Sequence, residues 1–169
     1  MSADTFTTAM FLITAVIAAG VLISAIFPVF YQMAGTFSSA GHASDVQLRT
    51  TIEIIKDVAF QNQNVKVWLK NTGSEQIPIS DIQRSDVICG DAGNFGRLSL
   101  VTGGSPGPSN PGWSYTLYDL NNNNIWDPGE TLEIDAYSTT INPADPVYFQ
   151  FSLPNGITSS DQFPVSTTP

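Results

Sequence analysis

The residues best suited to chemistry stand together in one run, Asp119-Leu-Asn-Asn-Asn-Asn-Ile-Trp-Asp-Pro-Gly-Glu130. Calcium takes six to eight hard oxygen ligands, and a twelve-residue loop supplies them at fixed positions. Here positions 1, 3, 5 and 9 carry side-chain oxygens, position 7 offers a backbone carbonyl and position 12 a carboxylate. The residues are, in order, Asp119, Asn121, Asn123, Asp127, Ile125 and Glu130. The spacing therefore predicts a structural Ca²⁺ site in one loop.

The run departs from the calcium-loop pattern at position 6, where Asn124 stands in place of glycine. After glycine, asparagine is among the residues that best tolerate the left-handed conformation of the sharp turn, so the match is weakened but not broken. Three carboxylates and two amides predict weak affinity, with a Kd of roughly 10⁻⁴ to 10⁻³ M. The alternative is an asparagine-rich hairpin turn whose side chains cap their own backbone.

The rest of the sequence argues against an enzyme. His42 is the only histidine and Cys89 the only cysteine, and no glycine-rich phosphate loop is present. These counts exclude a Cys/His nucleophile pair within the β region and an internal disulfide. The net charge of −9 would repel nucleic acid, so nucleic acid is not expected as a partner. Because no catalytic set is recognised, no small-molecule substrate is expected either.

The N-terminal segment is apolar and carries no Asp, Glu, Lys or Arg from Thr5 to Ser44. It exceeds the roughly 20 apolar residues that cross a bilayer. We therefore expect one transmembrane helix over residues 1–35. Residues 36–48, which are small and polar, are expected to form a stalk or a continuation of the helix.

A cleaved secretory signal is the alternative interpretation of this segment, with Ser38-Ser39-Ala40 as the cleavage site. Met1-Ser-Ala-Asp4 lacks the positive charge of such signals, and the apolar run is too long for one. Small residues four apart, Ala15/Ala19 and Gly20/Ser24, would let neighbouring helices approach closely. They keep open a helix-bundling filament subunit as a second possibility.

The remainder of the chain is typical of an all-β domain. Short runs with period-2 alternation are separated by turns rich in Gly, Pro and Asn. The predicted strands are 51–59, 64–70, 85–89, 97–101, 113–118, 131–137 and 146–153. Seven strands without a helical pattern indicate an immunoglobulin-like β-sandwich over residues 49–165, with a flexible tail at 166–169. Its aromatic residues (Trp68, Trp113, Tyr115, Phe149 and Phe151) are expected to supply much of the core.

Four stretches carry a resemblance to a known family. They are Phe11-Leu-Ile-Thr-Ala-Val-Ile-Ala-Ala-Gly-Val-Leu-Ile23, Ile26-Phe-Pro-Val-Phe-Tyr-Gln-Met-Ala-Gly-Thr-Phe-Ser-Ser39, Leu48-Arg-Thr50 and Val67-Trp-Leu-Lys-Asn-Thr-Gly-Ser74. The sequence resembles the archaellum-associated FlaG (ArlG) family, whose relatives are FlaF and, more distantly, the archaellins. The resemblance covers about the first hundred residues; the acidic loop region beyond them is less specific.

The resemblance implies a structural role and specific partners. It implies a single-pass protein in the cell membrane, with its N-terminus in the cytoplasm and its β domain outside, in the pseudoperiplasm at the archaellum base. It further implies a stator or anchor that bridges the membrane and the surface layer, with a FlaF-like protein, a surface-layer protein and other copies of itself as partners. Archaellins carry a basic leader ending in Gly, and we read its absence here as favouring an anchor. The alternatives are a filament-forming archaellin-like or pilin-like subunit and a calcium-dependent surface binding module.

Exposed strand edges of a sandwich can pair with a strand of another sandwich. We therefore expect homotypic or heterotypic contacts through one sheet edge of the β domain. The sequence does not indicate which strand forms that edge.

Overall fold

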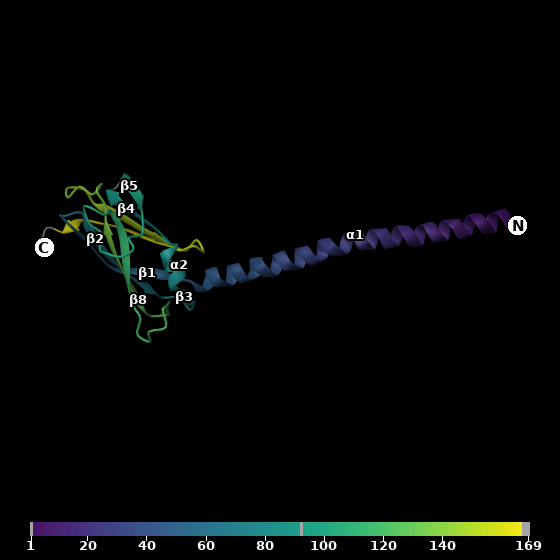
Figure 1. The fold of residues 1–169 in the computed structure, drawn as a ribbon, viewed down its shortest axis with the longest axis horizontal. Coiled ribbons are helices and arrows are strands. Elements are labelled where there is room, and N and C mark those ends of the chain that lie inside the picture. Colours follow the sequence, from purple (N-terminus) through teal and green to yellow (C-terminus); the bar gives the residue numbers. More distant parts are fainter. Residues whose placement is uncertain (1, 92, 167–169) are drawn as a thin grey trace. The chain divides into compact units, whose positions relative to one another are not determined.

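The computed structural model describes residues 2–91 and 93–166. It divides into two compact units, Met1–Ser44 and Asp45–Pro169. Helix α1 (Ser2–Arg49) forms the described part of the first unit, and its last five residues, from Asp45 to Arg49, belong to the second unit. Residues 36–48, for which a stalk or a helix was expected, are helical (Figure 1).

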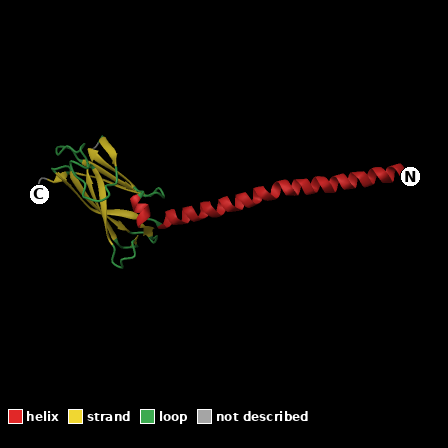
Figure 2. Ribbon diagram, viewed as in Figure 1, coloured by secondary structure: helices red, strands yellow, loops and turns green. Residues whose placement is uncertain are grey.

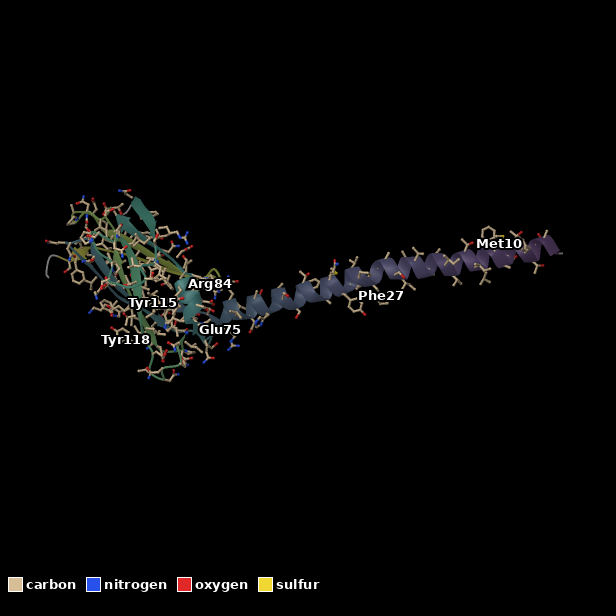
Figure 3. The ribbon with its side chains drawn as sticks, viewed as in Figure 1. Met10, Phe27, Glu75, Arg84, Tyr115 and Tyr118 are labelled. Carbon is tan, nitrogen blue, oxygen red and sulfur yellow. The ribbon has the colours of Figure 1, made fainter. Side chains whose placement is uncertain are left out.

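Helix α1 is long and apolar enough to cross a membrane. Its large apolar side chains are exposed, and Figure 3 shows Met10 and Phe27 projecting away from the helix axis. The hydroxyls of Thr7 and Thr14 donate to the carbonyls four residues earlier, both at 2.8 Å. These hydroxyls therefore need no outside partner, which removes most of the cost of placing them in hydrocarbon.

The β domain holds all the strands and one short helix (Figure 2). Its elements in chain order are β1 (Ile52–Phe60), β2 (Asn64–Asn71), β3 (Ile77–Pro78), α2 (Ile79–Gln83), β4 (Asp86–Asp91), β5 (Asn94–Leu98), β6 (Gly112–Tyr118), β7 (Ile125–Trp126), β8 (Thr131–Tyr137), β9 (Val147–Ser152), β10 (Thr158–Phe163) and β11 (Val165–Ser166). Of the predicted tail at 166–169, Ser166 ends β11 and residues 167–169 lie outside the described part of the chain.

Two main sheets make the sandwich. One has five strands in the order β11-β1-β2-β8-β6, the other four in the order β10-β9-β4-β5, and β3 pairs with β7 in a small third sheet. All strand pairs are antiparallel except β1 with β11. The expected fold class, an all-β sandwich following one apolar helix, is confirmed.

The core lies between the two main sheets. Alternate residues along each central strand are buried, as in Val65, Val67 and Leu69 of β2, because successive side chains point to opposite faces of a sheet. Every residue of the core cluster lies between Ile52 and Phe163. Residues 45–169 therefore bury a complete core of their own.

Aromatic rings join the sheets at the centre of this core. Phe151 of β9 meets Trp113 of β6 edge to face, with ring centroids 6.4 Å apart, and meets Trp126 of β7 in the same way at 6.5 Å. All three rings are buried. The prediction that Trp68 belongs to the core is wrong, because Trp68 shares the outer face of β2 with Lys66 and Lys70. Trp126 occupies the core instead.

Three further features differ from the expectation. The strand predicted at 97–101 is observed as β5 at Asn94–Leu98, and Leu100 forms only an isolated bridge to Trp113. A single helical turn, α2, follows β3, although no helical pattern was recognised; five residues are too few to show a helical period. Strand β10 was also missed, because its sequence Thr-Ser-Ser-Asp-Gln-Phe is polar at nearly every position. Edge strands with little buried surface leave no alternating pattern in the sequence.

A cross-strand cluster on the outer face fixes the register of three neighbouring strands. The Glu133 carboxylate of β8 accepts hydrogen bonds from Lys66 Nζ at 2.9 Å, Trp68 Nε1 at 3.1 Å and the Tyr118 hydroxyl at 2.5 Å. The Glu133 side chain is only 13% exposed. The hydrogen bond from Tyr118 is the largest influence that lowers the pKa of Glu133, and Lys66 adds to it against the opposing effect of burial.

We predict that Glu133→Gln lowers the free energy of unfolding by about 1–3 kcal/mol at pH 7, because its amide cannot accept all three donors. A carboxylate with a lowered pKa stabilises the fold above its ordinary pKa of 4.5, and this contribution is lost as pH falls through the folded-state value. The difference between wild type and variant should therefore shrink in denaturant melts below pH 4.5. Glu53→Gln, an exposed change on β1, should shift stability by less than about 0.5 kcal/mol.

Candidate functional site

The predicted calcium loop joins β6 to β8 and contains β7. Asn122 and Asn124 have positive φ angles of 58° and 59°. Asn124 thus takes the left-handed conformation expected at the position where calcium loops carry glycine. The loop turns sharply at this point, as the sequence spacing requires.

Carboxylates at the two ends of the loop bind its backbone. Asp119 accepts the N–H groups of Asn121 at 3.2 Å, Asn122 at 2.6 Å and Asn124 at 2.8 Å. The buried Glu130 carboxylate accepts the N–H of Leu120 at 2.9 Å with one oxygen and that of Asp127 at 3.0 Å with the other. The first and last predicted ligands therefore both hold the loop in its wound conformation.

Asp127 lies between the amide side chains. Its carboxylate accepts hydrogen bonds from Asn121 Nδ2 at 2.9 Å, Asn123 Nδ2 at 2.8 Å and Gln76 Nε2 at 2.6 Å. These bonds, with that from Asn121 the largest influence, lower the pKa of Asp127. Asn121 and Asn123 also accept backbone N–H groups two residues on, from Asn123 at 3.1 Å and Ile125 at 2.8 Å.

The donor set suits calcium in its chemistry, with three carboxylates and two amide oxygens on one loop. In the observed arrangement these oxygens accept hydrogen bonds from the loop itself, as in the alternative of a self-capped turn. Among residues 2–91 and 93–166, no three His, Cys, Asp or Glu side chains form a group that could hold a metal. Calcium binding by Asp119, Asn121, Asn123, Ile125, Asp127 and Glu130 stays a prediction.

The prediction is tested by thermal melts of residues 45–169 in chelator and in calcium at 100 times the predicted Kd, roughly 10–100 mM. Calcium at 100 times its Kd would stabilise the fold by about 2.7 kcal/mol, which raises Tm by several degrees. Glu130→Gln should remove most of this calcium-dependent shift, and Asp145→Asn, outside the loop, should leave it unchanged. The comparison is made within each variant, since Glu130→Gln also removes an acceptor of backbone N–H groups. Equal wild-type melts in the two conditions would identify the loop as a self-capped turn.

The lone cysteine and the lone histidine are not close to this loop in the chain and contribute nothing to it. Cys89 is fully buried in β4, and burial raises the pKa of its thiol to about 12. A thiol that stays protonated at neutral pH is a poor nucleophile. His42 lies within α1, in the other unit, and the buried, protonated Cys89 offers no nucleophile for a catalytic pair.

The other feature suited to binding is the free edge of β6. The N–H and C=O of Trp113 bond to Ser99 and Val101 at 2.9 and 2.8 Å, on the side away from β8. Backbone groups alternate in direction along an antiparallel pair, so those of Tyr115 and Leu117 point the same way. Within the described residues, no backbone hydrogen bond reaches these outward groups.

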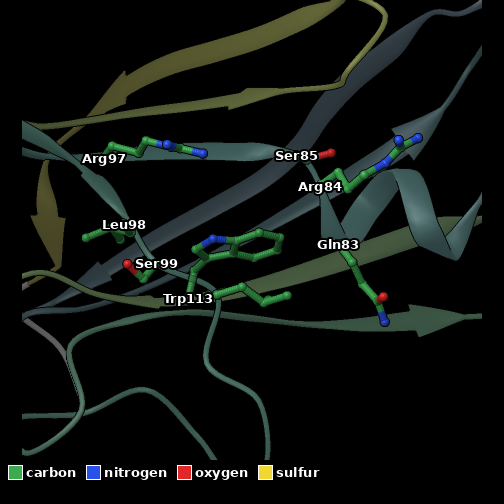
Figure 4. Close-up of a pocket in the computed structure, with 8 residues that line it drawn as sticks. Gln83, Arg84, Ser85, Arg97, Leu98, Ser99 and Trp113 are labelled. Atoms are coloured by element: carbon green, nitrogen blue, oxygen red, sulfur yellow. The ribbon is translucent and has the colours of Figure 1, made fainter.

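Two hollows border this edge. One, of about 330 Å³, is lined by residues that include Gln83, Arg84, Arg97 and Trp113 (Figure 4). The other, of about 400 Å³, lies beside Ile79, Tyr115, Leu117 and the start of the calcium loop. The side chains of Trp113, Tyr115 and Leu117 lie on one face of β6, and Gln83 of α2 donates to the Tyr115 hydroxyl at 2.8 Å. The edge therefore offers unpaired backbone groups flanked by apolar side chains, which is the arrangement that receives an added strand.

The family model described as archaeal-type flagellin matches residues 3–163. The chain belongs to this family. Its members are structural proteins of the archaellum and not enzymes, which agrees with the absence of catalytic residues expected from the sequence. An uncharacterized protein of Archaeoglobus fulgidus is 27% identical over 168 residues, covering 96% of this chain and 99% of the relative.

Solved structures of the archaellum share the fold of this flagellin-family chain. The archaellum periplasmic stator protein FlaG from Sulfolobus acidocaldarius is 24% identical, with a TM-score of 0.53, covering 68% of this chain and 99% of FlaG. A chain of the archaellum periplasmic stator complex of FlaF and FlaG from the same organism matches at 25% identity with a TM-score of 0.52. The match covers 66% of this chain and 87% of the chain in the complex. The archaeal flagellum of Methanospirillum hungatei strain JF1 matches at 11% identity with a TM-score of 0.52, covering 92% of this chain and 93% of the flagellum chain.

Sequence reasoning did not find the β6 edge of this flagellin-family domain. It predicted strand 113–118 but not that Ser99–Val101 would pair with only its first part. That pairing depends on a connection of ten residues between Val101 and Gly112, whose path no local pattern specifies. The alternation of Trp113, Tyr115 and Leu117 was the one available signal.

Proposed function

We propose that the chain is a membrane-anchored stator or anchor component of the archaellum that bridges the membrane and the surface layer. The observation that carries the proposal is an apolar helix in a chain whose fold, over 68% of its length, matches nearly the whole of the Sulfolobus stator protein. In this proposal α1 is the anchor, the N-terminus is cytoplasmic and the acidic β domain lies outside the cell. A surface-layer protein is the expected outer contact.

A second candidate is a filament subunit. The likeness to the Methanospirillum flagellum supports it, because that match extends over 92% of the chain and so includes helix α1. In a filament the helices would bundle in a core, whereas in an anchor each helix would cross the bilayer. The two candidates place the same helix in different surroundings.

Cell fractionation separates the two candidates. We expect the native protein to remain with membranes after archaella are sheared off, to resist extraction by salt and to be released by detergent. Protease added to intact cells stripped of their surface layer should cleave the β domain and spare α1. Recovery of most of the protein in purified filaments would contradict the anchor role and support the filament subunit.

The partner proposed for the β6 edge is a FlaF-like sandwich domain. The solved FlaF–FlaG complex supports such a partner, and the outward backbone groups of Tyr115 and Leu117 support pairing by strand addition. The hollows beside them would receive alternate side chains of the added strand. Co-purification from native membranes is the direct way to identify the partner.

We predict that Leu117→Pro weakens binding of a co-expressed FlaF-like domain at least tenfold, because proline removes the outward N–H of β6 without touching the ladder to β8. Leu117→Ala is the matched control: it loses the same side chain, keeps the N–H and should bind nearly as well as wild type. Thermal melts with a single cooperative transition must first show that both variants are folded. Equal binding by Leu117→Pro and Leu117→Ala would exclude this edge as the contact.

A further inference from the structure

The outer face of the four-stranded sheet is nearly free of charge. The β domain carries all six basic residues of the chain and every acidic residue except Asp4. On this face the described charged side chains form a single ion pair between Arg97 of β5 and Asp86 of β4. The outer face of the five-stranded sheet, by contrast, presents six charged side chains: Glu53, Lys56, Lys66, Lys70, Glu133 and Asp135.

The strand register arranges the side chains of this face in rows, in which Arg97 is the only cation among the described residues. Ser160, Gln150, Ile88 and Arg97 lie side by side on β10, β9, β4 and β5. Alternate residues of the same strands, such as Phe149, are buried in the core, so this row faces outward. The face is thus built of amides, hydroxyls and apolar groups.

Side-chain contacts hold the face rigid. The Tyr148 hydroxyl donates to Gln150 Oε1 at 2.7 Å, and Gln150 Nε2 donates to Ser152 Oγ at 2.9 Å. Phe95 packs on Tyr148 with ring centroids 4.8 Å apart, and the residue between them in the register, Gly90, has no side chain to separate them. Phe95 is nevertheless 50% exposed. Side chains already ordered before binding lose less entropy in an interface.

We propose that the outer face of the four-stranded sheet pairs with the same face of a second copy of this chain about a two-fold axis. Both outer faces carry equal numbers of cations and anions, but this one has only two charged side chains to remove from water, against six on the five-stranded sheet. A two-fold interface must be self-complementary, and a face that carries one cation and one anion meets this condition, since Arg97 of each copy can face the partner's Asp86. Aromatic residues with few charges are typical of interface centres.

The size of the face predicts weak pairing. Four strands spaced about 4.8 Å apart, with six residues rising about 3.3 Å each, cover about 400 Å² per copy. A stable complex buries about 800 Å² per partner, so the isolated domains should associate weakly. Two copies held in one membrane would pair far more often, because tethering raises their effective concentration. The pairing goes beyond the proposed anchor function, since an anchor can work with or without it.

The test uses residues 45–169, which bury a complete core, in sedimentation velocity across a concentration series. Wild type should show reversible dimers at high concentration. Gln150→Lys and Gln150→Glu should each weaken self-association at least tenfold, because either charge meets its own copy across a two-fold axis. An equal mixture of the two variants should recover association at least to the wild-type level.

The matched controls are Thr116→Lys and Thr116→Glu, on the outer face of the five-stranded sheet, which should change self-association less than twofold. A wild-type domain that stays monomeric at millimolar concentration would overturn the proposal. So would Gln150 variants that associate like wild type, or a mixture that recovers nothing. None of these outcomes bears on membrane retention, the readout for the anchor role.

Discussion

The contact of Phe151 with two indole rings is the interaction on which the rest of the β domain depends. Phe151 comes from the four-stranded sheet, Trp113 from the five-stranded sheet and Trp126 from the small third sheet, so one aromatic cluster joins all three. Buried aromatic side chains contribute large apolar areas, and edge-to-face pairs add about 0.5–1.5 kcal/mol each beyond that burial. The cluster also positions both candidate sites. Trp113 begins the β6 edge, and Trp126 holds the loop from Asp119 to Glu130 against the core.

The loop from Asp119 to Glu130 combines one fully buried side chain with several exposed polar ones. Trp126 is fully buried and its indole N–H donates to the Glu130 carbonyl at 2.9 Å, while the neighbouring asparagines are exposed. Asn71 of β2 completes the attachment, since its Nδ2 donates to the Trp126 carbonyl at 3.0 Å and to Glu75 at 2.8 Å. These bonds attach the base of the loop to the core. Hydrogen bonds within the loop, such as those accepted by Asp119, keep its wound shape. An ion, if it binds, would meet a loop that is already ordered.

The sequence predicted those elements whose burial is periodic. Strand 131–137 was predicted with the bounds observed, and 64–70 and 113–118 to within one residue, because each alternates between a buried and an exposed face. It did not predict β10, whose edge position buries little, or the burial of Trp126, which lies in a segment of Asn and Pro. Which part of the β6 edge stays unpaired depends on where residues 99–101 pass beside this strand, since among its described residues they bond only to Trp113. Periodicity reports which residues are buried, but not which strands become neighbours.

The burial of Cys89 has a practical consequence for labelling. Its thiol is shielded by the core and remains protonated at neutral pH, so thiol-directed reagents will leave the folded wild-type chain unmodified. Any cysteine introduced on the surface would therefore be the single reactive thiol, without prior replacement of Cys89. Leu120, the second residue of its loop, is 86% exposed and is a suitable position for a fluorophore or spin label. For distance measurements with labels, the wild-type chain can therefore serve as the cysteine-free background.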